Sequence, residues 1–297
     1  MERNKKIAEL LAKSKAVVSD GAWGTLLQQA GLKPGECPEL WCVNHADIVE
    51  GVAREYAAAG AAMIKTNSFG GNVFKLKHYG LDGQADELNE AAVRLSKNAA
   101  GGAIVIASMG PTGEMLVTEE VTEEELYDVF RSQAEALERG GADAVCIETM
   151  SDIEEACVAT KAVRENTRLE VICSFTFDRT VRGDYRTMMG VSPTNAAIAA
   201  AEAGADVVGT NCGNGMEQMV EIIAEMRQAV PEIPLYASAN AGSPKLVDGV
   251  NIFPNTPEDM ARLIPAMIEA GANIIGGCCG TTPAHIRAML WSLQPRI

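Results

Sequence analysis

Three cysteines are the residues of this 297-residue sequence with the clearest potential for chemistry. Cys278 and Cys279 are adjacent in "GGCCG", and Cys212 ends the apolar run "VVGTNC". Adjacent cysteines are poorly placed to share a disulfide, because the two sulfurs must reach a narrow geometry within one dipeptide. Thiolates suit zinc in tetrahedral sites, and a catalytic zinc site keeps one position free of protein ligands. We therefore predict that the three cysteines bind one Zn²⁺ with an open fourth position. The alternative is that they pack as small buried residues.

A zinc ion with three thiolate ligands favours one kind of reaction. Such a centre is electron-rich and a poor Lewis acid, so hydrolysis is not its natural work. A substrate thiol that fills the open position loses its proton and stays nucleophilic. The ligand set therefore indicates methyl transfer to a small thiol, with no catalytic residue needed beyond the metal-activated thiolate.

The elements that must position these cysteines repeat along the chain. Segments 58–67, 139–149, 202–212 and 269–279 each run from a helix-ending glycine through an apolar stretch to polar or sulfur-bearing residues. Further apolar stretches lie at 16–20, 103–108, 170–175 and 234–239, and helical patterns separate the strands. One such helix begins with a predicted capping box of Thr122 and Glu125. Eight alternating units predict a single-domain (β/α)₈ barrel over residues 1–297, with an open doubly wound sheet as the alternative.

The predicted barrel brings many polar residues to one place, because active sites of such barrels lie at the C-terminal ends of the strands. Carboxylates, hydroxyls, amides and thiols occupy those ends: Asp20, Gly21, Thr66, Asn67, Ser108, Glu148, Thr149, Thr176, Asn211, Cys212, Asn240, Cys278 and Cys279. These residues are therefore predicted to meet at the mouth of the barrel.

Composition limits the remaining classes of protein. A net charge of −15 argues against a nucleic-acid or anionic-membrane surface. The charged start "MERNKKIAELLAKSKAVVSD" excludes an ordinary secretory signal, and no run approaches the length of a membrane span. The expected location is the cytoplasm, where cysteines stay reduced or bind metal.

Other sulfur and imidazole groups have simpler expected roles. Cys146 and Cys173 lie within apolar runs and should pack in the core. Cys37 and Cys42, in "ECPELWC", are expected to be inert loop thiols, although they could reach the mouth. His285 should be a surface or capping residue on the last helix rather than a metal ligand.

Motifs along nearly the whole chain resemble the zinc-dependent homocysteine S-methyltransferase family, most closely the homocysteine-binding module of cobalamin-dependent methionine synthase. They are "DGAWGTLLQ" (20–28), "KTNSFGGN" (65–72), "MGPTGEML" (109–116), "ETM" (148–150), "GTNCGNG" (209–215), "ANAGSP" (239–244) and "GGCCGTTPAHI" (276–286).

The resemblance implies the same three zinc ligands and a site for L-homocysteine. It implies that Asp20 and Glu148 hold the amino group of the substrate and that backbone amides around Gly21 and Ala22 take its carboxylate. Thr66 and Asn211, which end strands within the same motifs, are also predicted to bind substrate.

The methyl donor is not specified by these motifs. The chain has no Asp-x-His-x-x-Gly stretch and no room for a corrinoid module, and no nucleotide fingerprint is present. We therefore expect a methylated corrinoid on a separate protein as donor, with methionine as product. Alternatives are an S-methylmethionine or betaine-type donor, a different small thiol as acceptor, or a structural or regulatory zinc-binding barrel. The long segments 177–190 and 240–259 are candidates for contact with the donor or for a lid.

Overall fold

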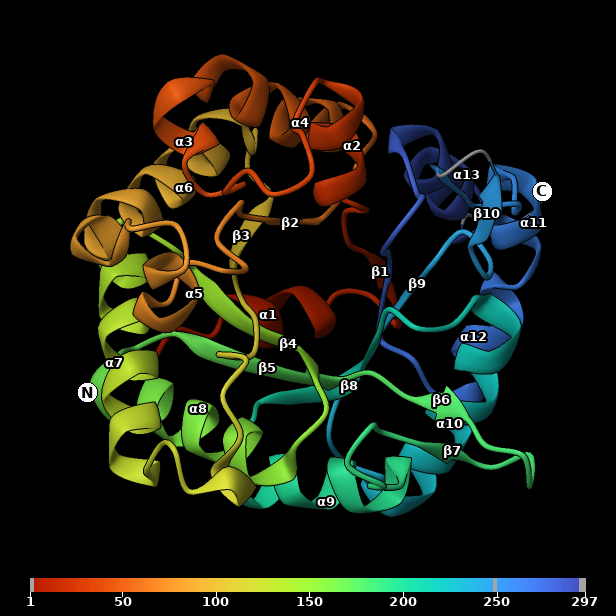
Figure 1. Ribbon diagram of the computed structural model, residues 1–297. Helices are drawn as coiled ribbons and strands as arrows, with labels where there is room; N and C mark the ends of the chain where they lie inside the picture. Colours follow the sequence, from red (N-terminus) through yellow and green to blue (C-terminus); the bar gives the residue numbers. More distant parts are fainter. Residues whose placement is uncertain (1–2, 248–249, 294–297) are drawn as a thin grey trace.

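Eight parallel strands form the centre of the protein. The computed structural model describes residues 3–247 and 250–293. The strands are arranged in the order β1-β12-β9-β8-β5-β4-β3-β2 around the central space in Figure 1. Their bounds are β1 Val17–Val18, β2 Met63–Lys65, β3 Ile104–Met109, β4 Ala144–Met150, β5 Glu170–Phe175, β8 Val207–Asn211, β9 Leu235–Ala239 and β12 Ile274–Gly277. All eight predicted strands are present.

The first and second strands close the sheet into a barrel. Ser19 forms a parallel bridge with Met63. The amide of Ala62 donates to the carbonyl of Val18 at 2.8 Å, and the amide of Asp20 donates to the carbonyl of Met63 at 3.0 Å. These bonds leave no open edge between β1 and β2, so the predicted (β/α)₈ barrel is confirmed and the open sheet is excluded.

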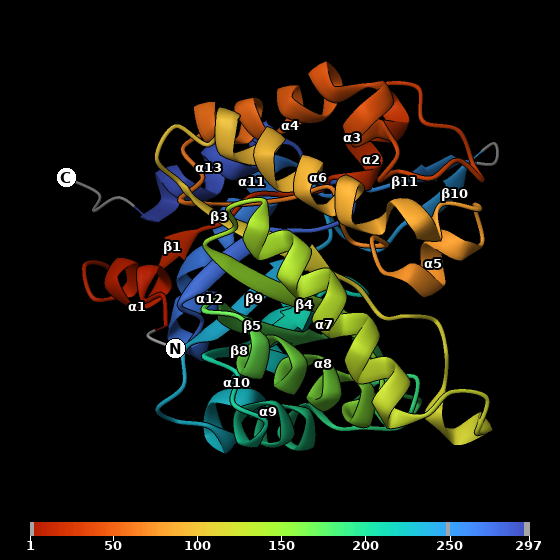
Figure 2. The same cartoon turned by 90° about the vertical axis from the view of Figure 1, so that its left-hand side faces the viewer.

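Helices surround the barrel, and short elements cover its two ends (Figures 1 and 2). The helices are α1 Lys6–Leu11, α2 Gly24–Gln29, α3 Trp41–Asn44, α4 Ala46–Ala58, α5 Val73–Lys77, α6 Ala85–Ala99, α7 Glu123–Arg139, α8 Ile153–Asn166, α9 Pro193–Glu202, α10 Met216–Ala229, α11 Pro257–Arg262, α12 Ile264–Ala270 and α13 Pro283–Leu293, with 3₁₀ turns η1 Asp82–Gln84 and η2 Leu116–Thr118. Two hairpins add β6 Asp178–Arg179 with β7 Tyr185–Arg186, and β10 Lys245–Val247 with β11 Val250–Ile252. In Figure 2, α1 lies at the end of the barrel opposite the β10–β11 hairpin.

Local signals in the sequence explain where the helices begin and end. Thr122 and Glu125 form the predicted capping box at the start of α7. All four helix-to-strand connections in the repeated segments contain a glycine with positive φ, namely Gly60, Gly141, Gly204 and Gly271, with φ values from 90° to 112°. Only glycine adopts this conformation without strain, which explains the recurrent residue.

Apolar side chains fill the barrel from its N-terminal end. One buried cluster there contains Ile7 of α1, Met63, Cys146 and Tyr236, and a larger cluster lies between strands and helices. Cys146 and Cys173 are both fully buried, which confirms their predicted place in the core. Because apolar residues fill the N-terminal end of the barrel, its polar residues are concentrated at the opposite end, the mouth.

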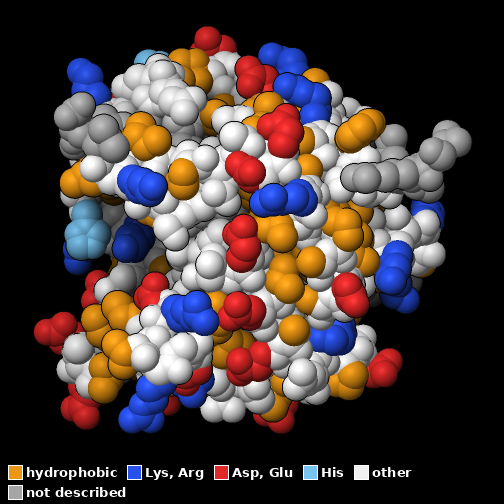
Figure 3. All heavy atoms as spheres, turned by 90° about the vertical axis from the view of Figure 1, so that its right-hand side faces the viewer, with side chains coloured by type: hydrophobic (Ala, Val, Ile, Leu, Met, Phe, Trp, Pro, Cys, Tyr) orange, Lys and Arg blue, Asp and Glu red, His pale blue; other side chains and the backbone are white. Residues whose placement is uncertain are grey.

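The outer surface of the barrel carries both charged and apolar side chains. On the face that includes α11 and α12, acidic and basic side chains are interspersed among apolar ones (Figure 3). Within residues 3–247 and 250–293, no helix is both long enough and apolar enough to cross a membrane.

Close packing of β8 against β9 makes Gly209 a sensitive position. A Cβ atom at Gly209 would lie 2.0 Å from the backbone oxygen of Tyr236, its register partner on β9. We expect Gly209→Ala to lower the free energy of unfolding by about 1–3 kcal/mol. The matched control is Gly51→Ala within α4, where the added methyl group meets nothing within 4 Å. This control should raise stability by roughly 0.5–1 kcal/mol. Denaturant unfolding of both variants would measure these changes. An unfolding free energy of Gly209→Ala equal to that of the wild type would contradict the prediction.

Candidate metal centre and substrate pocket

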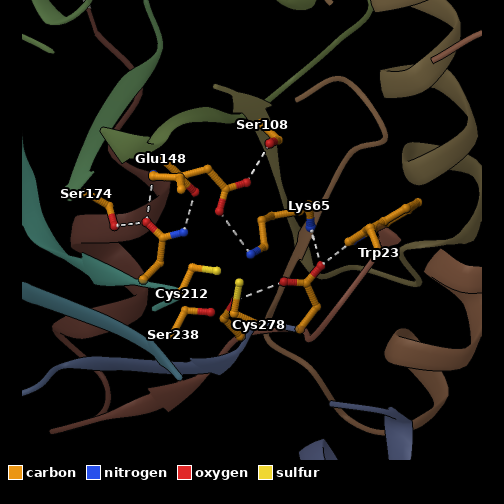
Figure 4. Close-up of polar contacts among 12 residues, drawn as sticks. Trp23, Lys65, Ser108, Glu148, Ser174, Cys212, Ser238 and Cys278 are labelled. Atoms are coloured by element: carbon orange, nitrogen blue, oxygen red, sulfur yellow. Dashed lines mark hydrogen bonds and ion pairs between the residues drawn. The ribbon is translucent and has the colours of Figure 1, made fainter. Parts of the chain in front are cut away.

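Cys212, Cys278 and Cys279 gather at the mouth of the barrel. Their sulfur atoms all lie within 4.8 Å of one another, and the three side chains are partly buried. Cys212 directly follows β8 and Cys278 directly follows β12, the two strands that flank β9. Cys212 and Cys278 are far apart in the sequence but lie close together, because β8 and β12 both pair with β9. Figure 4 shows Cys212 and Cys278 pointing toward one another.

Strand β9 fixes the separation of the cysteine backbones. The amide of Cys212 donates to the carbonyl of Ser238 at 3.0 Å, and the amide of Cys278 donates to the carbonyl of Ala239 at 2.7 Å. The Ser238 hydroxyl donates to the carbonyl of Gly277 at 2.7 Å. Adjacent residues of one strand thus hold both cysteine-bearing segments, which makes the arrangement rigid.

The backbone is strained where the thiols converge. Cys212 has φ 59° and Thr149, at the end of β4, has φ 64°, both in the left-handed region that non-glycine residues seldom adopt. The side chain of Asn211 bonds to Thr149 twice: its Oδ1 accepts from the Thr149 amide at 2.8 Å, and its Nδ2 donates to the Thr149 hydroxyl at 2.7 Å. Asn211 Oδ1 also accepts from the Ser174 hydroxyl at 2.6 Å. Asn211, predicted to bind substrate, therefore has its polar atoms directed at the protein.

The donor set fits a zinc ion. Cys212 Sγ and Cys279 Sγ are 3.8 Å apart. Tetrahedral zinc with Zn–S bonds of about 2.3 Å places neighbouring sulfurs roughly 3.8 Å apart. Hydrogen bonds from Cys278 and Cys279 lower the pKa of the Cys212 thiol, while the same contacts with Cys212 raise the pKa of the other two. A divalent cation would bind such a thiolate together with the two thiols, and the thiols would release their protons.

The cluster offers three ligands rather than four. Among the described residues, the only group of histidine, cysteine and acidic side chains with the spacing of a metal site consists of these cysteines. Asn240 lies beside Cys212, and its buried Oδ1 has no hydrogen-bond partner within the described part of the chain. A metal ion held by these three thiols would keep an open ligand position beside this acceptor, where a further molecule could bind.

Asp20 is fully buried and is already well bonded. Its Oδ2 accepts from the Trp23 indole at 2.8 Å and from the Lys65 amide at 2.7 Å, and Ser19 donates to its Oδ1 at 3.1 Å. Burial raises the pKa of Asp20, although the charge of Lys65 and the bond from Trp23 oppose this effect. Asp20 therefore connects β1, β2 and the segment before α2 at the mouth of the barrel.

Glu148 faces a lysine that we did not predict as a site residue. Glu148 Oε2 is 3.3 Å from Lys65 Nζ, and Glu148 Oε1 accepts from the Ser108 hydroxyl at 2.5 Å. Lys65 Nζ is also 3.4 Å from the Tyr236 hydroxyl oxygen. Burial lowers the pKa of Lys65, but the combined electrostatic interactions with Glu148, Tyr236 and Asp20 outweigh this effect and raise the pKa well above its ordinary value. Figure 4 shows Lys65 and Glu148 pointing toward one another beside Cys212 and Cys278.

The remaining predicted substrate residues lie at the same end of the barrel, after β1 and β2. The Ala22 amide donates to Thr281 Oγ1 at 3.0 Å. A Cβ atom at Gly21 would lie 2.6 Å from Thr281 Oγ1 and 2.7 Å from the Tyr56 hydroxyl oxygen. Thr66 is buried, and its hydroxyl oxygen accepts from the Ser108 amide at 3.1 Å and lies 2.6 Å from Ser68 Oγ. The structure thus places all these residues at the mouth and assigns each a protein contact or close neighbour.

Cys37, Cys42 and His285 lie outside the thiol cluster. Burial raises the pKa of Cys37 to about 11, and its thiol donates to Glu39 at 3.3 Å. Cys42 is buried, and its thiol donates to the carbonyl of Asn67 at 3.4 Å. Both contacts agree with inert thiols. His285 is buried rather than on the surface, and its Nδ1 accepts from the Thr282 amide at 3.1 Å, so the predicted capping role is confirmed.

The two long segments form hairpins near the mouth. In residues 177–190, Arg186 pairs with Asp184 at 2.7 Å, and the guanidinium of Arg179 lies 6.0 Å from the ring centroid of Tyr185. In residues 240–259, the β10–β11 hairpin leads to Asn255, whose carbonyl is 3.1 Å from His285 Nε2. These segments therefore have local structure of their own instead of being irregular loops.

A (β/α)₈ barrel with three cysteines gathered at its mouth defines a class of barrel proteins whose strand ends bring together thiols that could hold a metal ion. Residues 17–292 match the sequence model of the family described as homocysteine S-methyltransferase. The chain belongs to the homocysteine S-methyltransferase family. The family predicted from the motifs, and a methyltransferase as the class of enzyme, are thus confirmed.

Individual relatives and solved structures agree with this family. The chain is 30% identical to a methionine synthase of Mycobacterium tuberculosis over 293 residues and 32% identical to one of Mycobacterium leprae over 302 residues. The alignments cover 92% and 95% of this chain, which spans only 24% of the length of each of these relatives.

Among solved structures, the metallated form of the homocysteine methyltransferase MmuM from Escherichia coli is similar with a TM-score of 0.78 and 25% identity. That match covers 95% of this chain and 98% of MmuM. The carboxyl transferase domain of Rhizobium etli pyruvate carboxylase, at 15% identity and a TM-score of 0.54, shares the fold alone.

Proposed function

We propose that this barrel is a zinc-dependent S-methyltransferase that transfers a methyl group to the thiolate of L-homocysteine and gives methionine. The observation that carries the proposal is the convergence of three sulfur atoms within 4.8 Å at the mouth of the barrel. Cys212, Cys278 and Cys279 would hold the ion and leave one position for the acceptor. When bound, zinc lowers the pKa of an acceptor thiol and keeps it as a nucleophilic thiolate at neutral pH.

The residues of the pocket would orient the acceptor. Glu148 offers a buried carboxylate close to the thiol cluster and is suited to accept hydrogen bonds from an ammonium group. Asp20 lies beside it in the pocket and would act on the same group, with Thr66, Gly21 and Ala22 shaping the walls. Holding the amino-acid end in this way would present the sulfur to the open position and the methyl donor to the mouth.

We propose a methylated corrinoid, carried outside the residues of this barrel, as the methyl donor. The likeness to the two mycobacterial methionine synthases supports this choice, as does the surface around the mouth. Phe69, Val181, Met188 and Leu246 are exposed on segments that follow three barrel strands, β2, β5 and β9. Exposed apolar side chains around a site suit contact with a large donor.

Two other assignments differ in testable ways. An S-methylmethionine or betaine-type donor keeps the thiol chemistry but needs no second macromolecule. A structural or regulatory zinc barrel requires a metal closed by a fourth protein ligand, whereas the cluster in the described residues supplies three. The open position therefore favours the enzyme over the non-catalytic alternative.

Calorimetric titration of L-homocysteine into the zinc-loaded protein tests the proposal. We expect binding with release of about one proton, measured by repeating the titration in buffers of different ionisation enthalpy. Turnover with a methylcorrinoid but not with S-methylmethionine would support the proposed donor. Absence of thiol binding in protein that retains zinc would contradict homocysteine as acceptor, and fast turnover with S-methylmethionine alone would contradict the corrinoid.

A further inference from the structure

His285 connects two segments that are distant in the sequence. It lies in the first turn of α13, and only 7% of its surface is exposed. Its Nδ1 accepts from the Thr282 amide at 3.1 Å, so the neutral ring carries its proton on Nε2. Nε2 lies 3.1 Å from the carbonyl oxygen of Asn255 and therefore donates to it. Capping of α13 needs only the first of these two bonds, so the second must serve another purpose.

A chain of backbone hydrogen bonds continues from Asn255 to the thiol cluster. The Asn255 amide donates to the carbonyl of Ala241 at 2.9 Å, and the Ala241 amide donates to the carbonyl of Cys279 at 3.0 Å. Residues 278–282, called here the cysteine turn, connect β12 to α13. Asn255 is thus tied to the cysteine turn twice, to Cys279 through Ala241 and to Thr282 through His285. These bonds close a ring around the turn.

Packing brings the same segment against the cysteine turn. A Cβ atom at Gly280 would lie 2.2 Å from Cγ of Phe253, so Phe253 packs directly on the Cα atom of this glycine. A Cβ atom at Gly242 would likewise lie 2.7 Å from Oδ1 of Asn255. Helix α11, which begins at Pro257, packs against α13 (Figures 1 and 2). Residues 253–255 are therefore in close contact with the cysteine turn.

Cys279 is the cysteine whose position depends most on this ring of bonds. The amides of Cys212 and Cys278 donate to carbonyls of β9 itself, whereas Cys279 is bonded to Ala241, two residues beyond the end of that strand. Cys279 Sγ lies 3.8 Å from Cys212 Sγ, which is roughly the separation that tetrahedral zinc requires. A small displacement of the cysteine turn would change this separation and so weaken metal binding.

We propose that His285 is a positioning residue of the metal centre, because its bond to Asn255 holds the cysteine turn in the arrangement that binds the ion. The inference rests on the proposed function, in which the three cysteines hold zinc. Among the described residues the metal-site group consists of the cysteines alone, so His285 acts through the bonds that reach Cys279. Because coupling is reciprocal, a bound ion would in turn stabilise the contact between the cysteine turn and residues 253–255.

Two substitutions at His285 separate this role from capping of α13. In H285N the amide oxygen can replace Nδ1 as acceptor for Thr282, but the side chain is too short to reach Asn255. In H285Q the amide nitrogen can replace Nε2 as donor to Asn255. H285N therefore keeps the cap and loses the connection, and H285Q keeps the connection. H78Q, at the exposed histidine that follows α5, is the matched control.

The zinc dissociation constant of each variant would be measured by competition with a chelator of known affinity. We expect H285N to bind zinc roughly tenfold to hundredfold more weakly than the wild type, the usual effect of losing a group that orients metal ligands. H285Q and H78Q should bind it within about threefold of the wild type. The absorption spectrum of Co²⁺ in place of zinc depends on ligand geometry, so H285N should change this spectrum and H285Q should not.

Hydrogen exchange of the unsubstituted protein adds a test that does not depend on the folding of a variant. Zinc should slow exchange of the Ala241 and Asn255 amides and leave the amides of α1, at the opposite end of the barrel, unchanged. Equal zinc affinity of H285N and H285Q, or exchange at Asn255 that zinc does not alter, would overturn the positioning role while leaving the proposed function standing. Failure of the wild type to bind zinc would overturn both.

Discussion

Replacing Cys278 with alanine should abolish both zinc retention and methyl transfer. Cys278 supplies one of three sulfurs, and the described residues offer no other side chain in the cluster to replace it. With two protein ligands left, the affinity for zinc should fall steeply, because three protein ligands are the usual minimum at a catalytic zinc. Metal content after dialysis and turnover with L-homocysteine would be measured on the same preparation.

A second cysteine variant separates loss of metal from loss of fold. Cys146 is fully buried among apolar residues in the lower part of the barrel. Cys146→Ala should reduce stability by roughly 1 kcal/mol through the cavity it leaves, yet retain zinc and activity. Intact turnover by zinc-free Cys278→Ala would show that the proposed mechanism is wrong, whatever the result for Cys146→Ala.

The fold was predictable because its strands carry similar signals. Gly60, Gly141, Gly204 and Gly271 each precede an apolar stretch and adopt the left-handed conformation expected of them. Once eight strands alternate with helices, the barrel follows, and with it the meeting of residues at the strand ends. The gathering of Cys212 with the pair Cys278 and Cys279 was predicted in this way, although they are 67 residues apart at their widest.

The role of Lys65 could not be predicted because strands buried on both faces lack an alternating pattern. In such a strand, sequence does not say which side chains enter the barrel and which face the helices. The available signal was a charged residue at the end of the apolar stretch "MIK", directly before the predicted site residue Thr66. Contacts of side chains across the barrel, such as Lys65 with Glu148, depend on the closure of the sheet and emerge only from the three-dimensional structure.

Asn211 is the second position at which sequence and structure suggest different roles. The motif predicts contact with substrate, whereas its three hydrogen bonds go to Thr149 and Ser174. These bonds hold Thr149 at φ 64°. The residue after Asn211 is Cys212, a predicted zinc ligand whose φ of 59° also lies in the left-handed region. A positioning residue for the metal centre and a substrate-binding residue would respond differently to substitution.

We expect Asn211→Leu to weaken zinc binding by roughly tenfold to hundredfold, the usual effect of losing a group that orients metal ligands. Leucine has similar size but leaves the Thr149 amide without its acceptor and the left-handed backbone without support. Competition with a chelator of known affinity would give the zinc dissociation constant.

The double variant Asn211→Leu/Thr149→Gly then distinguishes the two roles. Glycine adopts φ near 64° without strain, so it should restore part of the zinc affinity if Asn211 acts by holding Thr149. If Asn211 instead binds substrate directly, Asn211→Leu would leave zinc affinity unchanged and weaken only L-homocysteine binding, and Thr149→Gly would restore nothing. The result therefore decides whether this buried amide serves the cysteine that follows it or the molecule that the cysteines are proposed to activate.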